Sequence, residues 1–334
     1  MRNSNSHLQE LLKVRQTLPR FRFNENTDIN IWRKNAYEKL SDLLGLPLER
    51  GDNSFELESE VTCDDYINYR FVVESEPGYY LPCHILIPNE KKDRYPLTLC
   101  FSGHCNGMHI ALGIAKSEAD KKSLDDWPER AMALRAIKDG RAALVIEARS
   151  FGECSINGYG TSCTETAKTA LLIGRTLIGE RVHDAMCALD AVISNFPIDE
   201  QNIVATGNSG GGTAAYYFSA LDRRVSVCAP SCSICTFDGS IIAMPHCMCN
   251  HIPSIRLYFD MSDISGLIAP RHLVIAAGEQ DSIFPIESTK KCFEEIEHIY
   301  KAVGAEENCH LLVVDGGHLN YAGQIWEKIK KIGY

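Results

Sequence analysis

The sequence predicts an α/β protein in which a mostly parallel sheet is covered by helices on both faces. From residue 97 onward, short apolar runs typical of strands alternate with longer runs typical of helices, and this alternation indicates βαβ units. The 334 residues are 45% hydrophobic and 23% charged, an ordinary globular composition that can build a large core.

The first part of the chain differs from this rhythm. Residues 7–18 and 28–44 carry apolar side chains at three- and four-residue spacings, which predicts a helical N-terminal arm. Between residues 55 and 99 the runs become short and strand-like, as in two hairpin strands that lead into a buried strand. We therefore predict an N-terminal extension over 1–64 and a main domain over 65–334. The strand-like runs of this part are 69–74, 80–87 and 97–101.

The remaining elements follow in alternation, apart from two stretches. Residues 152–173 and 230–268 show no clear period, and such insertions are usually loops or lids over a site. The predicted helices lie near 126–139, at 175–196, after Ser209, at 286–303 and from 321, and the predicted strands lie at 142–147, 203–206, 225–229, 272–277 and 310–314.

Charge and composition argue against several classes of partner. Lys and Arg number 34 and Asp and Glu 44, so the formal net charge is −10, which offers no basic footprint for nucleic acid or an anionic membrane. No apolar run approaches the roughly 18 to 20 residues that cross a bilayer, and the N-terminus is polar. We expect a cytoplasmic protein whose 14 cysteines are mostly reduced.

One segment combines a strand, a tight turn and a helix around a serine. Gly207-Asn-Ser209-Gly-Gly211 follows the apolar run 203–206 and precedes the helix-like run 212–218. In a nucleophile elbow the serine is held in a strained turn, so residues two positions away must be small. We predict Ser209 as a nucleophile. A phosphate-binding turn needs further glycines at set spacing or a lysine after the last one, and neither is present.

A serine hydroxyl needs a histidine base and a carboxylate that orients this base. In the strand–turn–helix arrangement the expected chain order is serine, acid, histidine. Asp281 is the predicted acid, because it lies in the turn that follows the strand-like run 272–277. The competing acids are Glu279 in the same turn and, in a less strand-like segment, Asp260 and Asp263.

The base is expected in a loop between the last strand and the last helix. His318 has this place, because it follows the run 310–314 and precedes the helix that begins near residue 321. It is the predicted base. His7, His298 and His310 fall within helix or strand patterns and are expected to be structural.

Acyl transfer also requires backbone N–H groups that face the developing oxyanion. One donor is expected from Gly210, which follows the nucleophile. The second is expected in the loop after the buried strand 97–101, where His104 is the first candidate and Cys105 the second.

A group of cysteines lies close together in the sequence, as the ligands of a metal site can. Five cysteines lie within 22 residues and are flanked by two histidines, a density at which zinc must be considered. Cys247-Met-Cys249 is a Cys-x-Cys pair, and no second pair recurs at the spacing of a zinc finger. We expect reduced thiols that pack a lid, and we predict no metal and no organic cofactor. The group comprises Cys228, Cys232, Cys235, Cys247 and Cys249, with His246 and His251.

One long helical run also carries paired charges. Arg181 and Asp184 are three residues apart within the predicted helix 175–196. An i,i+3 ion pair or a role in helix docking is therefore expected for them.

With these residues placed, the sequence resembles the α/β-hydrolases, and more narrowly the acetyl xylan esterase and dienelactone-hydrolase-like bacterial esterases. The resemblance covers roughly residues 65–334 and is carried by 207–211, 278–281 and Gly316-Gly-His318. The run from Glu147 to Cys154 is similar to the family's Asp-x-Arg-Gly-x-Gly-x-Ser turn, with Glu, Ser and Cys at three of its positions. The oxyanion loop also departs, since it reads Phe-Ser-Gly-His where relatives usually have His-Gly.

The resemblance implies a serine carboxylic-ester hydrolase that acts through an acyl-enzyme, without metal or organic cofactor. Its expected substrate is a small-molecule ester, such as a short acyl ester, acetyl above all, of a carbohydrate or small metabolite. Lactone or dienelactone hydrolysis, a prolyl-oligopeptidase-like peptidase and a non-catalytic hydrolase scaffold are the alternatives. Nucleic-acid and membrane partners are not expected, and the formation of a homo-oligomer stays open.

Overall fold

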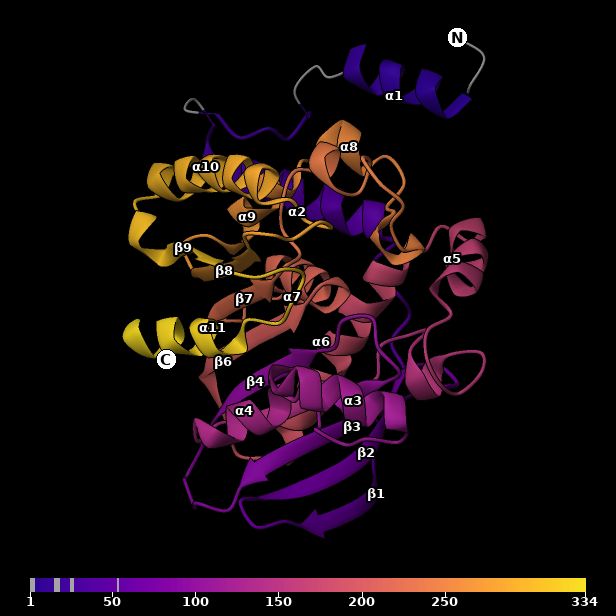
Figure 1. Cartoon of the computed structure of the whole chain (residues 1–334), viewed down its shortest axis with the longest axis vertical. Helices are drawn as coiled ribbons and strands as arrows, with labels where there is room; N and C mark the ends of the chain where they lie inside the picture. Colours follow the sequence, from indigo (N-terminus) through magenta and orange to yellow (C-terminus); the bar gives the residue numbers. More distant parts are fainter. Residues whose placement is uncertain (1–3, 15–18, 25–26, 53) are drawn as a thin grey trace.

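The computed structural model describes residues 4–14, 19–24, 27–52 and 54–334 (Figure 1). Within this part of the chain nine strands form one sheet, in the order β1-β2-β3-β5-β4-β6-β7-β8-β9. Helix α1 lies at one end of the long axis of the molecule and β1 at the other (Figure 1). Among the described helices none has the length and apolar character needed to span a bilayer.

The strands are β1 (Phe55–Thr62), β2 (Tyr66–Glu76), β3 (Tyr79–Pro88), β4 (Tyr95–Phe101), β5 (Ala142–Ile146), β6 (Ile198–Asn208), β7 (Val227–Ser231), β8 (His272–Gly278) and β9 (Cys309–Val314). The helices are α1 (Ser4–Val14), α2 (Ile29–Leu44), α3 (Glu118–Asp126), α4 (Met132–Lys138), α5 (Cys163–Leu172), α6 (Leu177–Asn195), α7 (Gly210–Leu221), α8 (Ile255–Tyr258), α9 (Met261–Ile268), α10 (Ile286–Ala302) and α11 (Ala322–Lys331).

The sheet is antiparallel at one edge and parallel over the rest. Strand β2 pairs antiparallel with β1 and β3, and β3 pairs antiparallel with β5. All pairs from β5 and β4 through β6, β7, β8 and β9 are parallel. The predicted mostly parallel sheet is confirmed. Strand β1 joins this same sheet, and the predicted division at residue 64 stays a prediction.

Helices cover both faces of the sheet because its central strands are apolar on both sides. In β6, Ile203 and Ala205 belong to the core beneath α2, α6, α7, α9 and α10, whereas Val204 belongs to the core beneath α4 and α11. Strands buried on both faces require this pattern of side chains. Parallel strands also end at one common edge, so the loops after them meet there.

Helix α2 follows the prediction for residues 28–44 closely. The Asp28 carboxylate caps its first turn by accepting hydrogen bonds from the backbone N–H groups of Asn30 and Ile31, at 2.9 and 3.2 Å. Gly45 ends the helix in the left-handed region at φ 79°. Of the other predicted arm helix, residues 15–18 lie outside the described residues, and α1 covers Ser4–Val14.

The predicted helix at 126–139 is wrong as a single element. The chain instead forms α3 and α4, separated by a 3₁₀ turn that begins at Pro128. Proline lacks an N–H and disfavours helical backbone at the preceding residue, so α3 ends at Asp126.

The two stretches predicted to lack regular structure contain helices. Residues 163–172 form α5, and α8 and α9 lie within 230–268. Helix α9 is stabilised by a capping box, in which Asp260 accepts a hydrogen bond from Met261 N at 2.9 Å and Asp263 accepts one from Asp260 N at 2.7 Å. A helix this short leaves little periodicity in the sequence, and capping and burial stabilise it.

Candidate active site

Ser209 lies between β6 and α7 in a sharply turned backbone. Its φ is 55° and its ψ is −126°, a conformation that is costly for a residue with a side chain. A Cβ at Gly207 would lie 2.5 Å from the carbonyl carbon of Gly211 and 2.7 Å from the oxygen of Phe101. The turn therefore requires glycine at this position, as the sequence pattern predicts.

Asp281 and His318 are brought together at the same edge of the sheet. Nδ1 of His318 donates a hydrogen bond to Oδ2 of Asp281 at 2.9 Å, and Oδ1 accepts from the N–H groups of Ile283 and Phe284 at 2.8 and 3.0 Å. Burial opposes the ionised form of Asp281, but these hydrogen bonds lower its pKa below the ordinary value. An ionised Asp281 holds the proton on Nδ1, so Nε2 of His318 is left as the basic nitrogen.

Backbone contacts hold the His318 loop beside the serine turn. The carbonyl oxygen of Leu319 accepts hydrogen bonds at 3.1 Å from Asn208 Nδ2 and from Ser231 Oγ. Ser231 O in turn accepts the N–H of Ser209 at 2.9 Å. No hydrogen bond joins the Ser209 hydroxyl to His318 among the described residues, and catalytic contacts of this kind often form only with substrate.

The acids that competed with Asp281 in the sequence, all of them among the described residues, form no hydrogen bond or ion pair with His318 in the structure. Glu279 is exposed, and Asp260 and Asp263 serve the capping box of α9. The histidines expected to be structural, His7, His298 and His310, lie in α1, α10 and β9.

The predicted oxyanion donors lie on two elements that meet at Ser209. Gly210 is the first residue of α7, and His104 lies in the loop that follows β4. Neither backbone N–H donates a hydrogen bond to another described residue, which leaves both free for a ligand oxygen. The backbone N–H of Cys105, the second candidate, also donates to no other described residue, and the Cys105 thiol donates to the carbonyl of Gly107 at 3.3 Å.

Glu147 is a buried carboxylate that anchors the chain after the oxyanion loop. Its Oε1 accepts a hydrogen bond from the N–H of Met108 at 3.0 Å, and its Oε2 accepts one from the N–H of Glu153 at 3.3 Å. Burial raises its pKa to about 7 despite these bonds. Glu147 therefore holds the segment that follows the oxyanion loop against the run that begins at Glu147.

Of the two roles expected for Arg181 and Asp184, the i,i+3 ion pair does not form, whereas Asp184 does help to dock α6 on its neighbours. Asp184 accepts two hydrogen bonds from Arg149, at 2.7 and 2.8 Å, because Arg149 reaches α6 from the loop after β5. Arg149 also pairs with Glu76 at 2.6 Å. The carboxylate of Asp184 is therefore paired with Arg149, which is distant along the chain, and not with Arg181.

Cys232, which the sequence analysis considered only as a member of the cysteine group, is a neighbour of the candidate triad. Its sulfur lies within 4.8 Å of ligand atoms of Asp281 and His318. Burial raises the pKa of Cys232 to about 12, so this residue is a neutral thiol that packs against the pair. The backbone of Cys232 has a positive φ of 48°.

The five clustered cysteines do not gather at one place. All 14 cysteines are free thiols, and most are buried. Cys247 and Cys249 meet two residues from distant segments, His104 and Cys163. Sequence spacing alone does not reveal this group, because its members come from three segments that are far apart along the chain.

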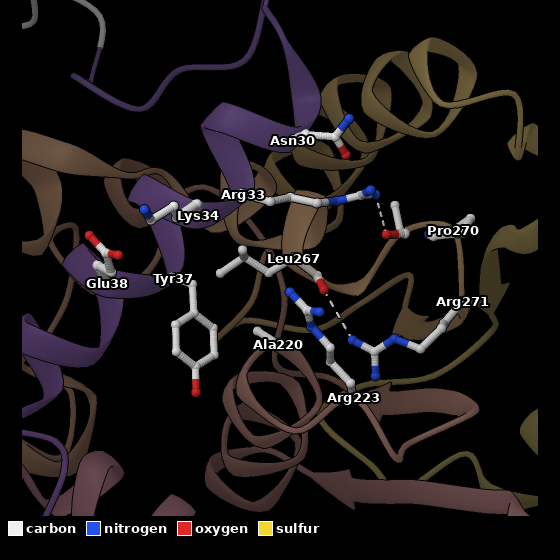
Figure 2. Close-up of a pocket in the computed structure, with 11 residues that line it drawn as sticks. Asn30, Arg33, Lys34, Tyr37, Glu38, Ala220, Arg223, Leu267, Pro270 and Arg271 are labelled. Carbon is white, nitrogen blue, oxygen red and sulfur yellow. Dashed lines mark hydrogen bonds between the residues drawn. The ribbon is translucent and has the colours of Figure 1, made fainter.

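A separate hollow lies at the opposite end of α7 (Figure 2). It is bordered by α2, by Ala220 and by the segment that includes Arg271, whose guanidinium donates to the carbonyl of Leu267 at 3.0 Å. Ala220 is eleven residues beyond Ser209 along the helix, so the hollow lies about 16 Å from the serine. It is not part of the candidate active site.

The fold is that of an α/β-hydrolase. A family model described as Abhydrolase family matches residues 4–302, and the chain belongs to this family.

Individual relatives extend this comparison. YtaP of Bacillus subtilis (strain 168), provisionally named a hydrolase, is 29% identical over 258 residues, which are 75% of this chain and 80% of YtaP. The fold is similar to that of a Bacteroides fragilis protein, provisionally named an acetyl xylan esterase, with a TM-score of 0.83, 16% identity and coverage of 99% and 95% of the two chains. A glucuronoyl esterase from Solibacter usitatus has a TM-score of 0.69 at 14% identity, with coverage of 94% and 96%.

Proposed function

We propose that the protein is a serine carboxylic-ester hydrolase in which Ser209, His318 and Asp281 form the catalytic triad. The observation that carries this proposal is the Asp281–His318 hydrogen bond of 2.9 Å, in a loop tied to the strained turn of Ser209. A nucleophile elbow together with an oriented histidine is the arrangement that acyl transfer requires.

The proposed mechanism proceeds through an acyl-enzyme. Nε2 of His318 takes the hydroxyl proton of Ser209 as the serine oxygen attacks the ester carbonyl carbon. The N–H groups of Gly210 and His104 stabilise the oxyanion that results. His318 then gives the proton to the leaving alcohol oxygen, and the carbon–oxygen bond breaks. Water attacks the acyl-enzyme in the same way, and the carboxylic acid and the free serine are released.

We propose a short acyl group, with acetyl preferred, on a carbohydrate or small metabolite. The similarity in fold to a protein provisionally named an acetyl xylan esterase supports this acyl group. The similarity in fold to carbohydrate esterases favours a sugar as the alcohol. Specificity within a fold depends on local contacts.

The test is the hydrolysis of p-nitrophenyl acetate, butyrate and octanoate. We expect kcat/KM to be highest on acetate and to fall roughly 10⁴-fold or more in Ser209→Ala. Ser219→Ala is the matched control, because the hydroxyl of this buried serine of α7 donates to Ala215 O of its own helix, and the activity of this variant should be unchanged.

Other outcomes separate the alternatives. Equal activity in Ser209→Ala would reject the proposed nucleophile. A wild-type protein that is inactive on every ester would reject the ester class, and lactones and proline-containing peptides would then be assayed. A fluorophosphonate probe that labels the wild type but not Ser209→Ala would exclude a non-catalytic scaffold.

A further inference from the structure

Four soft ligand atoms meet beside the oxyanion loop. The imidazole of His104 and the thiols of Cys163, Cys247 and Cys249 have ligand atoms that all lie within 4.8 Å of one another. His104 Nε2 is 3.4 Å from the sulfur of Cys249 and 3.8 Å from that of Cys163. We propose that these four residues bind one zinc ion in a tetrahedral site.

The spacing agrees with tetrahedral coordination. Zinc binds cysteine sulfur at about 2.3 Å and histidine nitrogen at about 2.1 Å, so a nitrogen and a sulfur on one ion lie about 3.6 Å apart. The two nitrogen–sulfur separations in this structure, 3.4 and 3.8 Å, lie on either side of that value. Three thiolates and one imidazole select zinc over hard cations such as Mg²⁺ or Ca²⁺. All four positions are filled by protein, as in structural zinc sites.

A buried cation supplies independent support. Arg181 is only 4% exposed, and among the described residues no carboxylate forms an ion pair with it. Its guanidinium donates to the carbonyl of Arg149 at 3.0 Å and to the sulfur of Cys163 at 3.4 Å, and it lies over the ring of Phe151 at 4.5 Å. A buried charge needs a compensating charge.

The zinc site supplies that charge. Zn²⁺ with three thiolates and a neutral imidazole carries a net charge of −1, which matches the single positive charge of Arg181. Neutral thiols would leave the guanidinium without a counter-charge. Arg181 is thus placed to act on the ligand Cys163 from outside the coordination sphere, as partners of metal ligands do.

The site would join three parts of the molecule that are far apart along the chain. His104 comes from the loop after β4, Cys163 begins α5, and Cys247 and Cys249 lie in the insertion between β7 and α8. The ring of His104 also packs at the elbow, since a Cβ at Gly210 would lie 2.8 Å from its Cε1. The ion would therefore hold the oxyanion loop in position; this consequence, unlike metal binding itself, rests on the proposed function.

The first experiment is metal analysis of the full-length protein, purified without chelators from zinc-supplemented medium. We expect about one zinc per chain in the wild type and in Ser209→Ala, and loss of it in Cys249→Ser. Cys235→Ser is the matched control, because this thiol is also buried in the 230–268 segment but lies outside the cluster. Zinc retained in Cys249→Ser, or absent from the wild type, would overturn the proposal.

Two further measurements keep the test decisive if Cys249→Ser does not fold. Replacement of the metal in the wild type by Co²⁺ should give the visible and near-ultraviolet bands of tetrahedral thiolate coordination, and octahedral cobalt bands would reject the site. Thiol titration after denaturation should find all 14 cysteines, whereas two missing thiols would indicate a disulfide in place of the ion.

Arg181→Met tests the charge argument separately. We expect roughly 10- to 100-fold weaker zinc binding in a chelator competition, and unchanged affinity would refute the role of Arg181. Removal of zinc should also lower kcat toward p-nitrophenyl acetate about tenfold. If the protein is no esterase, the zinc stoichiometry and the cobalt spectrum still decide the metal site.

Discussion

Asp281 uses both oxygens of its carboxylate for different tasks. One oxygen receives Nδ1 of His318, and the other receives the N–H groups of Ile283 and Phe284. The ring of His318 also lies against that of Phe284, with centroids 5.9 Å apart and an angle of 11°. The orientation of the histidine therefore depends on one carboxylate and the turn that holds it.

We predict that Asp281→Asn lowers kcat by about 10⁴-fold, because the amide cannot accept hydrogen bonds at both of its ends and His318 loses its fixed tautomer. The measurement is kcat on p-nitrophenyl acetate, with circular dichroism to verify folding. Glu279→Gln, in the same turn but exposed, should retain wild-type activity. Less than a tenfold loss in Asp281→Asn would contradict the role assigned to this carboxylate.

Helix α2 shows that an N-terminal element can be part of the main core. Its buried residues include Trp32, Ala36, Leu40 and Leu44, which recur at helical spacing and pack in the larger hydrophobic core. On the same helix Ile31 is 62% exposed. One face of α2 therefore stabilises the protein and the other faces solvent.

We predict that Leu40→Ala lowers the free energy of unfolding by about 2–5 kcal/mol, because it leaves a cavity where the side chain was fully buried. Ile31→Ala, on the exposed face, should change it by less than about 0.5 kcal/mol. Urea denaturation followed by circular dichroism measures both. Equal effects of the two substitutions would mean that α2 is not docked as described.

Buried charges connect the stability of the whole molecule to pH. The pKa of Glu147 is raised from about 4.5 to about 7 by burial, so the folded protein holds this proton more tightly than the unfolded chain. Its stabilising effect is fully present below about pH 4.5 and is lost as the pH rises through about 7. Other groups act in the opposite direction, such as His84, whose pKa is lowered by burial to about 4.

We predict that the difference in unfolding free energy between the wild type and Glu147→Gln changes with pH. Because glutamine does not titrate, the wild type should lose about 3 kcal/mol relative to the variant as the pH rises from about 4.5 to 8. Urea titrations across that range measure the difference, and Glu279→Gln should show no such trend. A constant difference between the wild type and Glu147→Gln would show that this carboxyl titrates normally.

Local patterns were sufficient for most of the regular elements, and several of the failures lie where tertiary contacts decide. The strand–turn–helix around Ser209 and the helix from Asp28 to Gly45 contain their own glycines and caps, so they can be predicted from neighbours in the chain. The short helices α5 and α9 were missed because burial and, in α9, a capping box stabilise them rather than a long periodic pattern. Spacing allowed an ion pair between Arg181 and Asp184 or a role in docking, and only the fold shows that Arg149 takes that carboxylate.

By itself, the sequence determined the mostly parallel sheet with helices on both faces, since the alternation of apolar runs records which surfaces must be buried. It also determined the order of serine, acid and histidine along the chain. Only the tertiary structure decided that His104, Cys163, Cys247 and Cys249 share one place. Their separation along the chain carries no distance information, because the sheet, through the common edge at which its strands end, brings their loops together.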